Sequence, residues 1–234
     1  MRFLLALILG ALVGGCIALA TIYYNPFSTQ RSLSPLSVSG NQQLVLNYSA
    51  VAADSILFTN NGESIVRPHP KKVLQLWEAP IRRSDARVAL LRDGRNQPVG
   101  IGIKFSSQSE QTQLLQGEAL IDSAWYIFMP GQGSLLIEQS ENHWPYLREI
   151  VFPAYWSSAD NWRGNWHGTI TYGPGALGTA RVFGGSGRFA GMQSDAIETL
   201  SATAYSSEVG PVAMEGQLTI ELQTETADAA EPAL

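Results

Sequence analysis

The sequence contains a single cysteine, Cys16, so no disulfide can form within the chain. Charged residues make up only 15% of its 234 residues, where a soluble domain usually carries about 25%. Hydrophobic residues make up 45%, a share that argues against intrinsic disorder. A second long apolar run is missing, which excludes a multi-span membrane protein. The net charge of −5 argues against nucleic acid as a partner.

Motifs for metal, phosphate or nucleophilic chemistry are also missing. The three histidines, His69, His143 and His167, lack metal-ligand spacing, so neither a metal nor a cofactor is expected. The stretch 173–178 (GPGALG) matches GxGxxG but leads into a strand-like segment instead of a helix. Ser186 lies in GGSGR, which departs from GxSxG at its last position. No pair of carboxylates has a spacing typical of acid–base catalysis, so no catalytic residue is predicted.

The N-terminal residues 1–24 form an apolar segment without charge between Phe3 and Tyr24. As a helix rising about 1.5 Å per residue, it is long enough to cross a bilayer. Arg2 precedes it, which places the N-terminus in the cytoplasm and the remainder outside. We therefore predict a single-pass inner-membrane protein whose domain lies in the periplasm.

Two alternatives for this segment remain open. Residues 13–16 (VGGC) resemble a bacterial lipobox, in which Cys16 would be the lipidated first residue of a lipoprotein. A cleaved signal peptide, which would give a secreted protein, also fits the short charged start and the apolar run. Small residues recur every fourth position, a pattern that allows two membrane helices to pair in a homodimer. These residues are Ala6, Gly10, Gly14 and Ala18.

The remainder divides into a Ser- and Pro-rich tether at 25–40, a β domain at 41–223 and a disordered acidic tail at 224–234. Apolar and polar residues alternate at many places in the β domain, which indicates strands with one dry face. In 214–222, Met214 through Leu222 supply that face at every second position. In 99–105 the same alternation assigns the dry face to Val99, Ile101, Ile103 and Phe105. Further strands are expected at 44–49, 55–59, 73–77, 87–91, 124–128, 135–139, 162–171, 178–183 and 197–205.

Short helices are expected at 109–117 and near 145–150. About ten strands with tight turns and few helices favour a barrel or a sandwich.

Tryptophan is concentrated in one stretch, because four of the six fall between Trp144 and Trp166. In the predicted strand at 162–171, the large rings of Trp162 and Trp166 alternate with glycines on one face. Slots between such rings could hold a flat ligand, and the same pattern could fill a barrel interior. The candidate ligand-binding residues are Trp125, Trp144, Trp156, Trp162, Arg163, Trp166 and His167.

Residues 179–191 (TARVFGGSGRFAG) resemble the late hairpin of the allene oxide cyclase and dirigent-like barrels. Residues 125–138 look like the aromatic hairpin that precedes it in those calycin-type barrels, so the resemblance covers roughly 120–222. The residues in the turn positions are Gly184, Gly185, Ser186, Gly187, Phe189 and Gly191. The resemblance implies one closed antiparallel β-barrel, in which the aromatic segment at about 142–177 is an insertion. It supplies no catalytic residue for this chain.

The whole chain also resembles a family of membrane-anchored proteins of Gram-negative bacteria, which implies an anchored protein and no particular activity. The predicted fold is mainly β: a single antiparallel β-barrel with one or two short helices, preceded by an N-terminal transmembrane helix. The predicted function is non-catalytic binding of an apolar or amphipathic small molecule by a membrane-tethered extracytoplasmic barrel. Two alternatives are an envelope interaction or scaffold module that uses the Trp-rich segment as an interface, and a lipid-epoxide cyclase or isomerase.

Overall fold

The computed structural model describes residues 2–24, 42–51, 54, 56–58, 64–65, 75–76 and 84–222. The predicted tether at 25–40 and the predicted tail at 224–234 lie outside the described residues, as do parts of the expected strands at 55–59 and 73–77.

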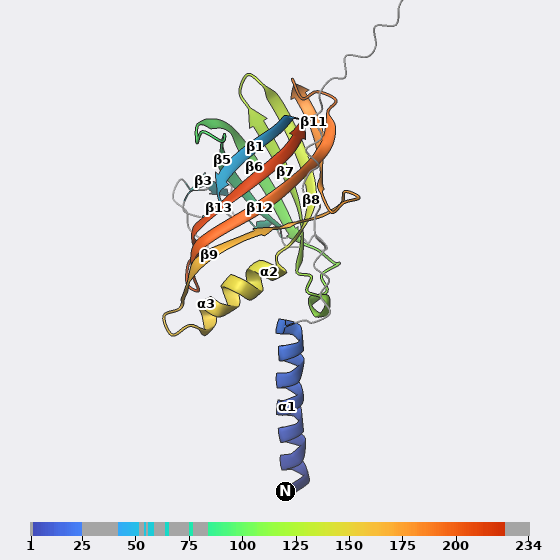
Figure 1. The fold of residues 1–234 in the computed structure, drawn as a ribbon, viewed down its shortest axis with the longest axis vertical. Coiled ribbons are helices and arrows are strands. Elements are labelled where there is room, and N and C mark those ends of the chain that lie inside the picture. The colour runs from blue at the N-terminus through green and yellow to red at the C-terminus, as the bar shows by residue number, and fades with distance from the viewer. Residues whose placement is uncertain are drawn as a thin grey trace, which may run out of the picture.

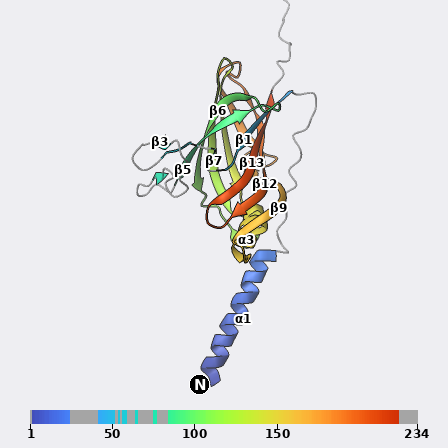
Figure 2. The same cartoon turned by 90° about the vertical axis from the view of Figure 1, so that its left-hand side faces the viewer.

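The described strands form one antiparallel sheet that closes on itself (Figures 1 and 2). Eight strands follow one another around the ring in the order β1-β13-β12-β11-β8-β7-β6-β5, and β5 returns to β1 through the pair Asn47–Arg92. Their bounds are β1 (Gln42–Ser49), β5 (Ser84–Arg92), β6 (Pro98–Gln108), β7 (Leu120–Met129), β8 (Gly133–Asn142), β11 (Ala180–Gly187), β12 (Gln193–Ser206) and β13 (Gly210–Leu222). The prediction of a mainly β antiparallel barrel is confirmed.

Five further strands pair with the strands of this ring or extend them. β2 (Ile56–Phe58) and β4 (Gln75–Leu76) pair with β5, and β3 (Ser64–Ile65) pairs with β2. β9 (Asn161–Thr169) runs along β12, and β10 (Thr171–Gly173) pairs with the end of β8. The single strand predicted at 162–171 is therefore two strands, because the chain changes partner between Thr169 and Thr171.

The N-terminal segment forms one helix, α1 (Arg2–Tyr24), that is long and apolar enough to cross a membrane. It projects from one end of the barrel (Figure 1), and none of its residues is buried. An N-terminal signal sequence would have the same length and composition.

A helical segment connects β8 to β9 and lies beneath the same end of the barrel (Figure 1). It consists of α2 (Trp144–Tyr146), the π-helical turn η3 (Leu147–Val151) and α3 (Phe152–Trp156). Pro153 has no N–H to donate to the carbonyl of Glu149, and the Phe152 N–H bonds to Leu147 O, one residue further back than in an α-helix. A second short helix, η2 (Leu114–Gln116), joins β6 to β7.

Apolar side chains fill most of the barrel interior. Trp125, Ile137, Phe189 and Leu218 are among the fully buried members of this core. In β13 the predicted dry face is confirmed, because Met214, Gly216, Leu218 and Ile220 all lie inside.

The prediction for β6 is wrong about which face points inward. Ile101 and Phe105 are 48% and 46% exposed on the outer wall, whereas Gly100 and Gly102 are buried. Side chains of neighbouring strands fill the space next to these glycines. A Cβ on Gly102, for example, would lie 2.8 Å from the ring of Trp125. The inward face of β6 therefore consists of glycines followed by Lys104.

The glycine-rich stretch that carries the family resemblance forms the end of β11 and the turn into β12. Gly187 and Gly191 have φ angles of +62° and +74°, which glycine adopts without strain. Phe189, between them, is buried in the barrel core at the end opposite α2.

Candidate functional site

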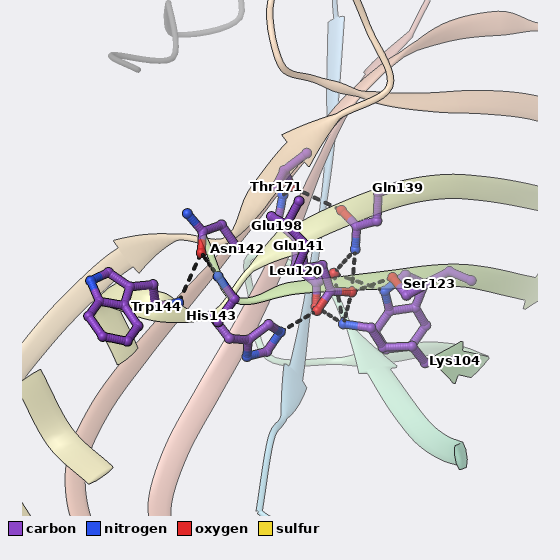
Figure 3. A network of polar contacts seen from close by, with 12 residues as sticks. Lys104, Leu120, Ser123, Gln139, Glu141, Asn142, His143, Trp144, Thr171 and Glu198 are labelled. Carbon is purple, nitrogen blue, oxygen red and sulfur yellow. Dashed lines mark hydrogen bonds and ion pairs between the residues drawn. The ribbon is translucent and has the colours of Figure 1, made fainter. Parts of the chain in front are cut away.

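Charged side chains meet inside the barrel, in the half that faces α2 (Figure 3). Lys104 comes from β6, Glu141 from β8, Glu198 from β12, and His143 from the link between β8 and α2. We call these four residues the charged cluster. They come from strands that are far apart in sequence and are brought together by the closure of the barrel.

Lys104 lies between the two carboxylates. Its Nζ is 2.7 Å from Glu141 Oε1, and 2.9 Å and 3.1 Å from Glu198 Oε1 and Oε2. Burial alone would lower the pKa of Lys104, but the charges of Glu141 and Glu198 outweigh it and raise the pKa above its ordinary value of 10.5. Lys104 therefore stays protonated at neutral pH.

Glu198 is completely buried and is surrounded by hydrogen-bond donors. Trp125 Nε1 donates to Oε2 at 3.1 Å, Tyr48 donates its hydroxyl to Oε1, and Gln139 Nε2 donates to Oε2. Thr171 orients Gln139 by donating to its Oε1 at 2.9 Å and accepts the Glu198 backbone N–H at 2.7 Å. An ionised carboxylate only accepts hydrogen bonds, so this set of donors is complementary to a charged Glu198.

Glu141 is bound by donors in the same way. Lys104, the Ser123 hydroxyl and Gln139 Nε2 all reach Oε1, and His143 Nε2 lies 2.7 Å from Oε2. Burial would raise the pKa of Glu141, but the charge of Lys104 and the hydrogen bond from His143 outweigh it, so the pKa lies well below the ordinary value. Burial, followed by the charge of Glu198, raises the pKa of Tyr48 well above 10.0.

These shifts predict how stability depends on pH. The pKa of Glu141 is lowered, so the unfolded chain takes up this proton near pH 4.5 before the folded protein does, and stability falls as the pH drops below 4.5. The pKa of Lys104 is raised, so the unfolded chain loses this proton first and stability falls as the pH rises above 10.5. Urea unfolding across the pH range measures both limbs. In the Lys104→Met/Glu141→Gln/Glu198→Gln chain the acid limb should flatten, and an acid limb of unchanged steepness would contradict this assignment.

Two members of the charged cluster are partly exposed to solvent, and two are not. The side chains of Lys104 and His143 are 13% and 21% exposed, while those of Glu141 and Glu198 are almost fully covered. His143 immediately precedes α2, so the accessible edge lies at the barrel end that the helical segment covers. We call this end the mouth of the barrel.

The hydrogen bond to Glu141 also orients the His143 ring. A carboxylate with a lowered pKa is ionised at neutral pH and can only accept, so Nε2 carries a proton and donates it to Glu141. Nδ1 has no hydrogen-bond partner among the described residues. A carboxylate that orients a histidine in this way is the arrangement used in general-base catalysis.

Aromatic rings line the mouth beside the charged cluster. Tyr146 of α2 packs against His143, Trp166 and Tyr205, with ring centroids 5.9–6.3 Å apart. Trp166 Nε1 donates to Glu149 Oε2 at 2.9 Å, which ties β9 to the helical segment. The mouth therefore combines an apolar aromatic wall with a charged interior.

The structure separates the seven predicted ligand-binding residues into distinct environments. Trp125 lies in the barrel core and donates to Glu198, whereas Trp144 is the buried first residue of α2 and packs against Phe152. Trp156 is largely exposed and stacks on Phe152. The seven residues do not converge on one place in the structure, and ligand binding by any of them stays a prediction.

The remaining four of these residues lie on β9. Trp162 and Trp166 are half-buried, whereas Arg163 and His167 are exposed and His167 Nδ1 lies 2.8 Å from Ser201 Oγ. The spaces above Gly164 and Gly168 hold the rings of Trp162 and Trp166 themselves, because a Cβ there would lie 2.8 Å and 2.6 Å from them. Trp162 and Arg163 also border a surface cleft of about 380 Å³.

The glycine at position 216 gives a direct test of how the charged cluster is packed. A Cβ on Gly216 would lie 2.0 Å from the ring of Tyr48, the residue that donates to Glu198. Gly216→Ala is expected to displace Tyr48 and to lower the free energy of unfolding by about 1–3 kcal/mol. Gly94→Ala is the matched control, because no atom lies within 4 Å of its Cβ. Equal denaturation midpoints for the two variants would show that Tyr48 is not held there.

Sequence comparison assigns no relatives to this chain: no protein-family model matches it, and no curated protein matches it. Among solved structures, a heme-binding cyclase that catalyses a [4+2] cycloaddition in neoabyssomicin biosynthesis matches with a TM-score of 0.38 and 9% identity, over 79% of this chain and 66% of that one. The Diels-Alderase AbmU from Streptomyces koyangensis matches with a TM-score of 0.38 and 10% identity, over 86% of this chain and 78% of that one. Similarity at this level carries no argument about function.

Proposed function

We propose that this protein is a membrane-anchored β-barrel that binds an amphipathic small molecule at its mouth. The polar group of the ligand would meet the accessible edge of the charged cluster, and its apolar body would lie against the aromatic wall at Tyr146 and Trp166. One observation carries the proposal: an ammonium group and two carboxylates are buried inside the barrel, and the partly exposed His143 of their cluster lies at the mouth.

Stability alone does not explain such a cluster. Burying three charges costs solvation energy, and apolar replacements of buried ion pairs are often as stable or more stable. Strongly shifted pKa values are more typical of binding and catalytic sites. His143 and Lys104 both contact Glu141, so the polar edge of the cluster suits a ligand hydroxyl or carboxylic acid, which both donates and accepts.

The membrane anchor belongs to the same proposal. α1 would span the inner membrane once, with Arg2 on the cytoplasmic side and the barrel in the periplasm. Lipidation at Cys16 is the alternative means of attachment, and Cys16 is exposed on α1. Incorporation of labelled palmitate into the wild-type chain but not into Cys16→Ser would favour the lipoprotein over the spanning helix.

Ligand binding is tested by thermal unfolding of the delipidated full chain in detergent, with and without a total lipid extract of Gram-negative inner membranes. A ligand that binds only the folded state raises the midpoint. We expect a rise for the wild type and none for Lys104→Met/Glu141→Gln/Glu198→Gln. The control Arg181→Met/Glu138→Gln removes two exposed charges from paired positions on β11 and β8, and it should behave as the wild type. Equal shifts in all three chains would refute binding at the cluster.

The His143–Glu141 pair favours a second candidate function, a proton-transferring enzyme such as the lipid-epoxide cyclase or isomerase implied by the resemblance. His143 Nδ1 would take up or return the proton, while Glu141 holds the ring. Incubation with an unsaturated fatty-acid epoxide should then give a product of unchanged mass, and His143→Asn should abolish its formation. If the wild type forms no product, this candidate function is refuted.

A further inference from the structure

Exposed apolar side chains gather on the mouth side of the barrel, outside the charged cluster. Two belong to η2, Leu114 and Leu115, and two belong to α3, Tyr155 and Trp156. Leu115 and Trp156 are 72% and 71% exposed, a large apolar area to leave in water. We call these four residues the apolar end face.

The apolar end face lies where the anchor helix ends. The ring of Tyr23, in the last turn of α1, lies 5.6 Å from that of Trp156, and α1 also contacts η2. Figures 1 and 2 both show α1 leaving the barrel beside α3. Any bilayer that α1 spans must therefore begin next to Trp156 and Leu115.

We infer that the apolar end face inserts into the interfacial layer of the membrane that α1 crosses. This inference rests on the membrane anchoring proposed above and adds a second point of attachment. Tryptophan and tyrosine prefer the bilayer interface, because their rings are apolar and their N–H or O–H groups stay hydrated. Tyr23 and Tyr24 would lie at the same depth as Tyr155 and Trp156 and would form one aromatic belt with them.

A lipid surface explains the position of these residues better than a protein partner does. Insertion requires apolar and aromatic side chains that point toward the end of a membrane anchor, and η2 and α3 both supply them. The arrangement also turns the mouth of the barrel toward the bilayer, since His143 and the apolar end face lie at the same end. An amphipathic ligand would then reach the charged cluster from the membrane without crossing water.

The test uses the full chain in a Cys16→Ser background, with an environment-sensitive fluorophore on one introduced cysteine. The probe sites are Leu115→Cys and Trp156→Cys, and the control is Ala190→Cys in the exposed β11–β12 turn at the opposite end. The chains are reconstituted into phosphatidylcholine–phosphatidylglycerol vesicles, and circular dichroism confirms that each is folded. Quenching by a nitroxide lipid is compared with quenching by aqueous iodide.

We expect the probes at 115 and 156 to emit at shorter wavelength, to be quenched by the nitroxide lipid and to be quenched several-fold less by iodide than the probe at 190. Equal iodide quenching at 115 and 190, in chains that float with the vesicles, would overturn the inference and leave the anchor intact. Failure of the chains to float would refute the anchor itself. If the probe at 115 were shielded from iodide in native membranes but not in vesicles, a protein partner would cover this face, and the inference would also be overturned.

Discussion

Replacing Lys104 with methionine is expected to lower the free energy of unfolding of the barrel by about 3–5 kcal/mol, because breaking a buried ion pair leaves uncompensated charge inside the protein. Lys104 is the only cation in contact with both Glu141 and Glu198 among the described side chains. Without it, at least one of these carboxylates must take up a proton to remain buried. Urea unfolding of wild type and variant at pH 7 measures the effect.

Two further chains separate charge from packing. Lys104→Met/Glu141→Gln/Glu198→Gln removes all three charges while keeping similar volumes, and we expect it to recover most of the lost stability. Arg148→Met breaks an ion pair with Glu149 on the outer surface and should cost less than about 1 kcal/mol. If Lys104→Met lowered the free energy of unfolding as little as Arg148→Met, the three charges would not form an enclosed cluster.

Truncation of Trp125 is the second change with a large expected effect. Its ring is fully buried, packs against Tyr48 with centroids 5.0 Å apart, and donates to Glu198. Trp125→Ala should lower the free energy of unfolding by about 3–5 kcal/mol, because it removes a large buried side chain and leaves a cavity. Chemical denaturation followed by far-ultraviolet circular dichroism measures this loss.

Graded variants identify what Trp125 contributes. Trp125→Phe keeps a ring but removes the donor to Glu198, and should cost about 1–3 kcal/mol. Trp156→Ala, at an exposed tryptophan in the same protein, should change stability by no more than about 0.5 kcal/mol in detergent. A Trp156→Ala loss as large as that of Trp125→Ala would place Trp156 in the protein core, against the exposed position described above.

Most of the strands could be predicted from the alternation of apolar and polar residues, because each strand of a barrel has one face toward the interior and one toward solvent. β13 shows this well: Met214, Leu218 and Ile220 fill the core, and the polar residues between them face out. β6 shows the limit. Its outer face carries Ile101 and Phe105, and its inner face carries glycines that make room for Trp125, so hydrophobicity alone chooses the wrong face.

The charged cluster could not be predicted from a sequence motif, because residues in contact are far apart in the chain. Lys104 and Glu198, for example, are separated by 94 positions. A weaker signal was present in the sequence. Glu198 occupies a position that alternation assigns to the interior, between Ala196 and Leu200, and a charged residue on a dry face indicates a buried partner. Sequence could not identify that partner, because strand register decides which residues meet across a barrel.

The tryptophan-rich stretch was recognised as distinctive, but its residues serve different purposes. Trp166 joins the aromatic wall through Tyr146, and Trp156 belongs to the apolar end face. Trp156 ends the helical segment, whereas Trp166 lies on β9. The π-helical turn before Pro153 is not visible in the hydrophobic periodicity of the sequence.

An amphipathic molecule that the charged cluster takes from the membrane should remain bound when the protein is extracted. Native mass spectrometry of the full chain, extracted gently from its membranes, detects such a molecule. We expect a mass above that of the polypeptide in the wild type and in Arg181→Met/Glu138→Gln, released on unfolding, and the bare polypeptide mass in folded Lys104→Met/Glu141→Gln/Glu198→Gln. A wild-type chain that carries no added mass, or an adduct retained equally by the charge-free chain, would contradict it.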